Sequence, residues 1–234
     1  MGKGIKLFTC DEYKFTTDTI ILANFASPLP KDNVLEIGTG CGAIPIILAR
    51  DNKAKHITAL EIQSEACELL KKSIKINNLE DKITVINKDV RDEDAIPLNK
   101  KYDMVICNPP YKKSGCGEVS ELYCRATARN ETQCTLEDII KKASKVLNQG
   151  GDLCMCNRVE RLCDMIGIMR LYKIEPKVLQ LVQYNIHKEP KLFLTRGKKF
   201  GKVGLRCNPT LTINNEKGEY TEEMKSIYKY YYKG

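Results

Sequence analysis

The sequence predicts an α/β protein with a mostly parallel sheet. Short apolar runs alternate with stretches in which apolar residues recur every three or four positions, and this alternation is typical of strands separated by helices. A glycine-rich turn follows the first apolar run, at positions 38–42. Two extended runs, 178–183 and 191–195, follow one another near the end and predict an antiparallel pair at one edge of the sheet.

Each expected element rests on its own local pattern. Strands are expected at the apolar runs 34–37, 56–61, 83–87, 103–107 and 152–156. Helices are expected at 43–50, 64–74, 136–147 and 160–172. Thr135 and Asp138 have the spacing of a capping box at the start of the third helix, and Gly150-Gly151 is expected to end it.

Length and composition favour one globular domain. The chain has 234 residues and a hydrophobic fraction of 42%, which is enough for a substantial core. We expect an N-terminal arm at 1–31, a core at 32–206 and a C-terminal tail at 207–234. No apolar run approaches the roughly 18 residues of a membrane span, and no signal core follows the N-terminus. A cytoplasmic protein without a membrane partner is therefore expected.

The 11 cysteines predict neither a metal site nor a disulfide framework. None forms a Cys-x-x-Cys pair, and their number is odd. Cys67, Cys107, Cys154 and Cys156 lie within expected helices or strands. Most cysteines are therefore interpreted as small apolar side chains in a reducing compartment.

The net charge of +8 is unevenly placed. Between Lys177 and Arg206 the only acid is Glu189, against eight Lys or Arg residues, so this region predicts an anionic partner, RNA or DNA first. The alternative is a solvated loop in a lysine-rich protein. The candidate contacts are Arg196, Lys198, Lys199, Lys202 and Arg206.

Three acidic positions accompany the glycine turn. The turn has Gly38, Thr39, Gly40 and Gly42, and its glycines permit close approach of a ligand to the backbone. Glu36 precedes it and would repel a phosphate, so a cationic or amine-bearing ligand is favoured. Glu61 ends the second strand, where a carboxylate can hold ribose hydroxyls, and Asp89-Val90 after the third strand could meet an adenine amino group.

Together these features resemble the Rossmann-like methyltransferases that use S-adenosyl-L-methionine and release S-adenosyl-L-homocysteine. The resemblance implies a seven-stranded, mostly parallel sheet with one antiparallel strand at the edge and helices on both faces. It also implies that the glycine turn approaches the methionyl part, that Glu61 holds the ribose and that Asp89 contacts the adenine.

Asn108-Pro109-Pro110-Tyr111 follows the fourth strand directly. Prolines make a rigid bend, and the Asn108 side-chain oxygen and Pro109 carbonyl can both accept hydrogen bonds from one amino group. Tyr111 offers a face for stacking on a planar group. The tetrapeptide matches the signature of methyltransferases acting on adenine N6, cytosine N4 or the glutamine side chain, so it specifies a planar nitrogen and leaves the molecule open.

The chain resembles the tRNA1(Val) adenine-N6-methyltransferase family over nearly its whole length. The resemblance is carried by the arm Tyr13–Ala23 and by the segments 128–131, 135–138, 150–162 and 215–223. It implies that Phe15 and Asp18 help to enclose the cofactor; an ordinary amphipathic start of a helix is the alternative for Asp18. Asn130 and Asn157-Arg158-Val159 depart from the family pattern, and a contact of these positions with RNA would change the target or the affinity.

The resemblance implies a tRNA or other RNA substrate whose adenine is extruded into the site. Lys112 and Lys113 are candidates for the flanking phosphates, although solubility alone could explain both. No obligate protein partner is evident. The alternatives are a release-factor glutamine-N5 methyltransferase, which usually carries a helical N-terminal domain, and a cofactor-binding scaffold without catalysis.

Overall fold

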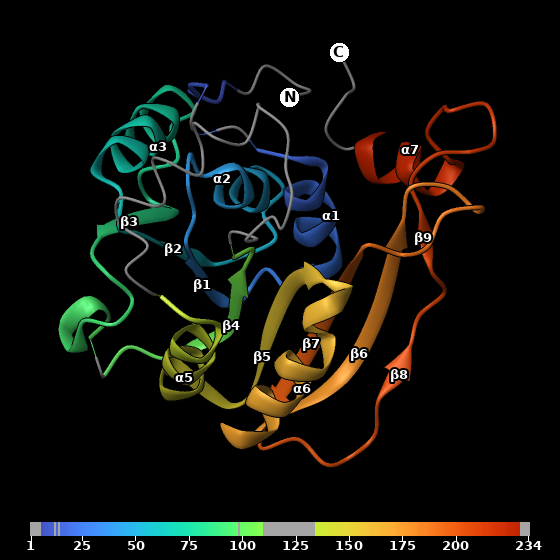
Figure 1. Ribbon diagram of the computed structural model, residues 1–234. Helices are drawn as coiled ribbons and strands as arrows, with labels where there is room; N and C mark the ends of the chain where they lie inside the picture. The colour runs from blue at the N-terminus through green and yellow to red at the C-terminus, as the bar shows by residue number, and fades with distance from the viewer. Residues whose placement is uncertain (1–5, 12, 14, 98, 110–133, 230–234) are drawn as a thin grey trace.

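A computed structural model describes residues 6–109, except 12, 14 and 98, and residues 134–229. One twisted sheet runs through this part of the molecule, with the strand order β3-β2-β1-β4-β5-β7-β6-β8 and β9 beside β6 (Figure 1). The strands are β1 (Asn33–Ile37), β2 (His56–Glu61), β3 (Ile83–Asn87), β4 (Tyr102–Cys107), β5 (Leu147–Arg158), β6 (Ile174–Gln183), β7 (Leu192–Lys199), β8 (Arg206–Cys207) and β9 (Leu211–Thr212).

Helices cover both faces of the sheet. One face carries α1 (Thr17–Ala26), α2 (Ala43–Arg50), α3 (Ser64–Ile76) and α7 (Glu222–Lys229). The other carries α5 (Leu136–Val146) and α6 (Leu162–Leu171). The 3-10 turn η1 (Glu93–Ala95) lies between β3 and β4, and η3 (Val159–Arg161) directly precedes α6.

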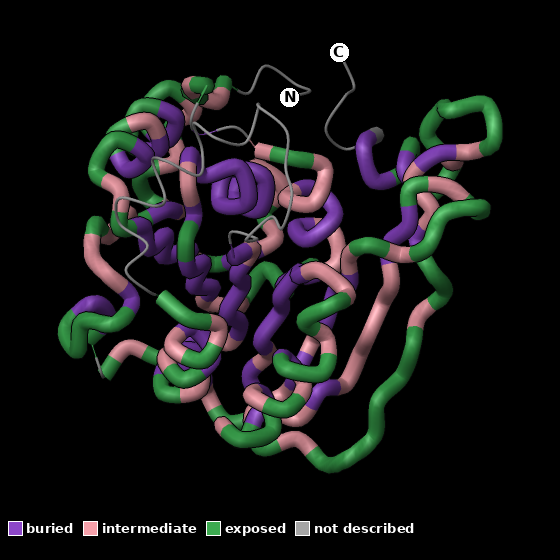
Figure 2. Tube along the Cα trace, viewed as in Figure 1, coloured by how far each residue is buried: buried purple, intermediate pink, exposed green. Residues whose placement is uncertain are grey.

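The central strands β1 and β4 are mostly apolar and buried because successive side chains enter different cores. In β1, Val34 packs with α1 and α2, whereas Leu35 packs with α5. In β4, Met104 and Ile106 lie in the core beneath α1 and α2, and Val105 lies in the core beneath α5. The buried residues accordingly form a continuous central band, with exposed residues on the outer helix faces and turns (Figure 2).

The α/β class and the antiparallel pair near the end are confirmed, while two details differ from expectation. The described residues form nine strands instead of seven. The two additional strands, β8 and β9, were not expected because each has only two residues and no hydrophobic pattern from which it could be predicted. The antiparallel strand β7 is not at the edge: β6 lies outside it, and β7 returns between β5 and β6.

The helix that begins with the Thr135–Asp138 capping box is also shorter than expected. The reciprocal capping bonds are present, but α5 ends at Val146. Leu147 already pairs with Tyr102 in the sheet, so the helix ends because the chain enters β5, and Gly150-Gly151 lies inside that strand. The glycines therefore do not end the helix.

The segment after residue 207 packs against the core. Leu211 in β9 and Met224, Ile227 and Tyr228 in α7 are buried in the same cluster as α1. Over the described ranges, every cysteine is a free thiol, and no group of three or more potential ligand side chains is arranged to hold a metal. None of the helices in these ranges has both the length and the apolar character to cross a membrane.

Candidate active site

The register of the parallel strands places the predicted site residues in one row. Ile37 of β1 pairs with Leu60 of β2 on one side and with Cys107 of β4 on the other. The next positions along these three strands are Gly38, Glu61 and Asn108. They therefore lie at the same level, at the carboxyl edge where the strand order reverses between β1 and β4, which is where open α/β sheets bind ligands.

The three glycines of the turn differ in what surrounds them. All have positive φ, +71° at Gly38, +55° at Gly40 and +83° at Gly42, which favours glycine at each. A Cβ at Gly38 or Gly40 would meet no atom within 4 Å, whereas one at Gly42 would lie 2.1 Å from Cδ1 of Leu70. The first two glycines thus leave room for a ligand along the backbone, and the third allows the turn to pack on α3.

Glu36 places a buried carboxyl group beneath the turn. It is 3% exposed, and the Thr39 hydroxyl donates a hydrogen bond of 2.5 Å to its Oε2. Burial raises the pKa of Glu36 well above its ordinary value, the bond from Thr39 opposes this, and the charge of Glu61 adds to it. A positively charged ligand would offset the cost of this buried charge, so the site suits a cationic cofactor.

Glu61 links the end of β2 to the glycine turn. The backbone N–H of Gly40 donates to its Oε2 at 2.8 Å, and that of Gln63 donates to its Oε1 at 3.0 Å. Burial raises the pKa of Glu61, and these two bonds lower it. A carboxylate has about four acceptor positions, so each Glu61 oxygen retains capacity for one hydroxyl of a ribose.

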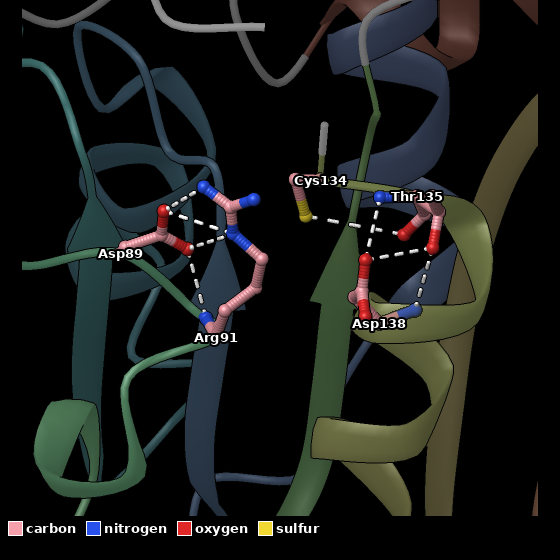
Figure 3. Close-up of polar contacts among 5 residues, drawn as sticks. All are labelled: Asp89, Arg91, Cys134, Thr135 and Asp138. Atoms are coloured by element: carbon pink, nitrogen blue, oxygen red, sulfur yellow. Dashed lines mark hydrogen bonds and ion pairs between the residues drawn. The ribbon is translucent and has the colours of Figure 1, made fainter. Parts of the chain in front are cut away.

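Asp89 is held by Arg91 (Figure 3). The Arg91 backbone N–H and Nε donate to Oδ1 at 2.8 and 3.1 Å, while Nε and Nη2 donate to Oδ2 at 3.0 and 2.6 Å. These bonds hold the pKa of Asp89 below its ordinary value and use its usual acceptor positions. The guanidinium faces the start of α5, where Cys134 lies. For Asp89 to accept a hydrogen bond from an adenine amino group, at least one of the bonds from Arg91 must therefore be broken.

A pocket joins the glycine turn to the start of the tetrapeptide. Its described lining consists of Tyr13, Phe15, Thr19, Glu36, Gly38, Thr39, Gly40, Cys41, Ala43 and Asn108. Phe15 was expected here, but Tyr13, Thr19, Cys41 and Ala43 were not. Of these four, only Tyr13 could have been expected from the sequence, because it is an aromatic residue at the start of the same arm as Phe15. Asp18 lies in the first turn of α1 and is outside this lining.

The tetrapeptide is described only in its first half. Asn108 is partly buried, and its Nδ2 donates to Oγ1 of Thr19 at 3.4 Å. Pro109 is buried. Val90, expected beside the cofactor, is 8% exposed and packs in the α5 core. Pro110, Tyr111, Lys112 and Lys113 lie outside the described residues, so their roles stay predictions.

The basic residues of β7 and the following turn lie away from this edge. Because β7 is antiparallel to β5, it leaves the carboxyl edge as it proceeds: Arg196 is opposite Cys154, and Lys198 is opposite Asp152. Lys198 bonds Asp152 at 2.8 Å, Lys199 donates to carbonyls at the end of α5, and the carbonyl of Lys202 accepts from Lys177.

Arg196 has a structural partner inside the molecule. Its Nη2 donates to the carbonyls of Phe25 and Ala26 at 2.7 and 2.8 Å, and its guanidinium lies 5.6 Å from the Phe25 ring centroid. These carbonyls end α1. Arg196 and Lys198 thus lie away from the carboxyl edge of the sheet, and Arg196 holds the end of α1.

The fold and the glycine-turn geometry define a Rossmann-like methyltransferase that uses S-adenosyl-L-methionine. The chain belongs to the methyltransferase small domain family, whose model matches residues 7–173.

The chain is similar to two proteins described as tRNA1(Val) (adenine(37)-N6)-methyltransferase. The relative from Porphyromonas gingivalis is 28% identical over 225 residues, covering 92% of this chain and 87% of the relative. The relative from Parabacteroides distasonis is 29% identical over 234 residues, covering 94% and 90%.

Among solved structures, a predicted O-methyltransferase from Agrobacterium tumefaciens superposes with a TM-score of 0.72. The two chains are 19% identical, and the match covers 92% of this chain and 96% of that one. At this identity the likeness supports the fold, while the family match and the site carry the chemistry.

Proposed function

We propose that this chain methylates the exocyclic N6 amino group of an adenine in RNA, and that the substrate is the adenine at position 37 of a tRNA. The observation that carries the chemistry is the placement of Asn108 in the pocket of the glycine turn. The relatives described above support the choice of base and RNA because they match nearly the whole chain and are described as acting on that adenine.

The chain's part in the reaction is to hold and orient the amino group. The Asn108 side-chain oxygen and the Pro109 carbonyl accept hydrogen bonds from the target NH2, which directs its lone pair into the pocket. As positive charge develops on the nitrogen, both acceptors stabilise it. The nitrogen becomes acidic only as it is alkylated, so no general base is required at this position.

S-adenosyl-L-methionine, when bound, supplies an electrophilic methyl group. We assign Glu61 to its ribose hydroxyls, Gly38 and Gly40 to backbone approach, and Glu36 to favouring a positive charge nearby. Phe15 closes the pocket from the arm, and Asp89 lies beyond Glu61 for the adenine. A tRNA substrate also favours a cytoplasmic location.

Methylation of tRNA from cells that lack the protein tests this proposal. Incubation with labelled S-adenosyl-L-methionine should produce N6-methyladenosine, and a transcript of the target tRNA with guanine in place of that adenine should remain unlabelled. Asn108→Ala should abolish transfer with cofactor affinity nearly unchanged. Asn148→Ala is the matched control, because Asn148 binds Asp103 near the opposite end of the sheet. Labelling of a release factor but not of RNA would refute the proposal.

A further inference from the structure

Thr19 contacts the side chain to which we assign the target amino group. Its Oγ1 lies 3.4 Å from Nδ2 of Asn108 and accepts a hydrogen bond from it, although the two residues are 89 positions apart. Both side chains line the same pocket, and both are partly buried. The contact therefore joins the N-terminal arm to the reacting end of the site.

The helix that carries Thr19 is fixed at both ends. Arg196 bonds the last carbonyls of α1, and the Tyr228 hydroxyl of α7 donates to Oγ1 of Thr17 at 3.2 Å. Between these points Ile20, Ile21 and Leu22 are buried in the core. Thr19 is thus presented from a helix that the core, β7 and α7 hold in place.

The orientation of the Asn108 amide decides what the site can bind. A carboxamide has a carbonyl oxygen that accepts hydrogen bonds and an NH2 group that donates them. An incoming amino group needs an acceptor, so an amide turned by 180° would oppose donor to donor. Because Nδ2 is directed to Thr19, the oxygen is directed away from α1.

We propose that Thr19 is a positioning residue for methyl transfer, which fixes the amide of Asn108 so that its oxygen faces the amino group of the substrate. The proposal rests on the function proposed for Asn108. Thr19 does not itself touch the reacting atoms; it acts by restricting Asn108 to one of two orientations of similar shape.

Thr19 also has a local role that an experiment must separate from this one. Its hydroxyl accepts a bond from the Thr16 backbone N–H at 3.4 Å and so completes the capping box of α1. A variant that only loosens the helix would lower stability without a specific effect on the chemical step.

Three single variants separate the two roles. Thr19→Val keeps the branched shape and removes the hydroxyl, Thr19→Ser keeps the hydroxyl, and Thr17→Val removes a hydroxyl of the same helix that bonds Tyr228. Thr19→Val should lower kcat about tenfold, with cofactor Kd within about twofold of the parent, because an orienting bond of this kind acts on geometry. Thr19→Ser should recover most of kcat, and Thr17→Val should lower Tm with kcat little changed.

Equal kcat in Thr19→Val and Thr17→Val would overturn the proposal. So would a Thr19→Ser variant as slow as Thr19→Val. A third outcome would refute this inference and leave the proposed function standing. In that outcome the parent transfers the methyl group, Asn108→Ala abolishes transfer, and Thr19→Val does not change it.

A second measurement does not depend on turnover. The side-chain NH2 resonances of Asn108, assigned by their loss in Asn108→Asp, should shift and exchange faster in Thr19→Val but not in Thr17→Val. Unchanged resonances in Thr19→Val would overturn the inference. If the Asn108 resonances shift in Thr19→Val as expected but the parent transfers no methyl group to RNA, the contact is supported and the proposed function is refuted.

Discussion

Arg196→Met should destabilise the fold strongly and leave RNA binding unchanged. The substitution keeps an apolar stem of similar length and removes the guanidinium. That group donates two bonds to the end of α1 and lies over Phe25, while its buried Nε has no partner among the described residues. The arm therefore loses its attachment to β7.

The magnitude follows from these contacts. Hydrogen bonds from a charged donor contribute about 1.5–3 kcal/mol each, and the ring contact adds about 0.5–1 kcal/mol. The unpaired Nε already costs about 1–3 kcal/mol in the folded state, and this cost disappears with the guanidinium. We expect a net loss of about 3 kcal/mol in the free energy of unfolding, or about 6–12 °C in Tm for a chain of this length.

Urea denaturation measures the stability, and tRNA binding at several salt concentrations measures the electrostatic contribution. Arg170→Met is the matched control: it removes the same charge, but the Arg170 side chain is 59% exposed and pairs with Glu175 at the surface. A loss of less than about 1 kcal/mol in the free energy of unfolding of Arg196→Met would refute the argument that Arg196 stabilises the end of α1. A selective fall in tRNA affinity with intact stability would instead restore the RNA-binding interpretation.

Three further predictions concern the cofactor residues. Gly42→Ala should cost about 1–3 kcal/mol in urea denaturation, and more than Gly40→Ala, because only its Cβ overlaps Leu70. Arg91→Ala should raise cofactor affinity by calorimetry, since Arg91 competes for the Asp89 carboxylate; a lower affinity would refute this competition. Glu36→Gln should abolish activity. Because the pKa of Glu36 is higher in the folded than in the unfolded protein, the parent loses stability as pH rises above 4.5. The variant lacks this ionisation, so its stability relative to the parent should increase over the same pH range. Unfolding measured on both sides of that pH tests this slope.

The sheet and its row of site residues could be predicted because both depend on local patterns. Strands that are buried on both faces are mostly apolar, as in β1 and β2, and β1, β2 and β3 match the expected runs to within one residue. Once the strands are parallel, the residues that follow them must meet at one edge. Gly38, Glu61 and Asn108 therefore lie at one level, as the pairing of Ile37 with Leu60 and Cys107 requires.

The contacts that complete the site depend on distant pairs. Thr19 meets Asn108 across 89 positions, and Arg196 meets Phe25 across 171. No periodicity links such residues, and a threonine in the first turn of a helix has the sequence pattern of an ordinary surface position. The bonds from Arg91 to Asp89 could not be predicted either, because an arginine two residues after an acid is compatible with many geometries.

The direction of β7 explains why the cations that cluster in the sequence lie at different distances from the carboxyl edge of the sheet. Cys107 pairs with Met155, so the next residues, Asn108 and Cys156, lie at the same level. A strand advances about 3.4 Å per residue, so the four steps from Cys156 to Asp152 place Lys198 about 14 Å below that level. Lys199 is one level further, and its ammonium is directed to the end of α5. Arg196, Lys198 and Lys199 therefore lie at successively greater distances from the carboxyl edge. Charge density along the chain measures attraction to a polyanion, whereas the position of each charge relative to the carboxyl edge decides whether it can help to deliver an adenine to Asn108.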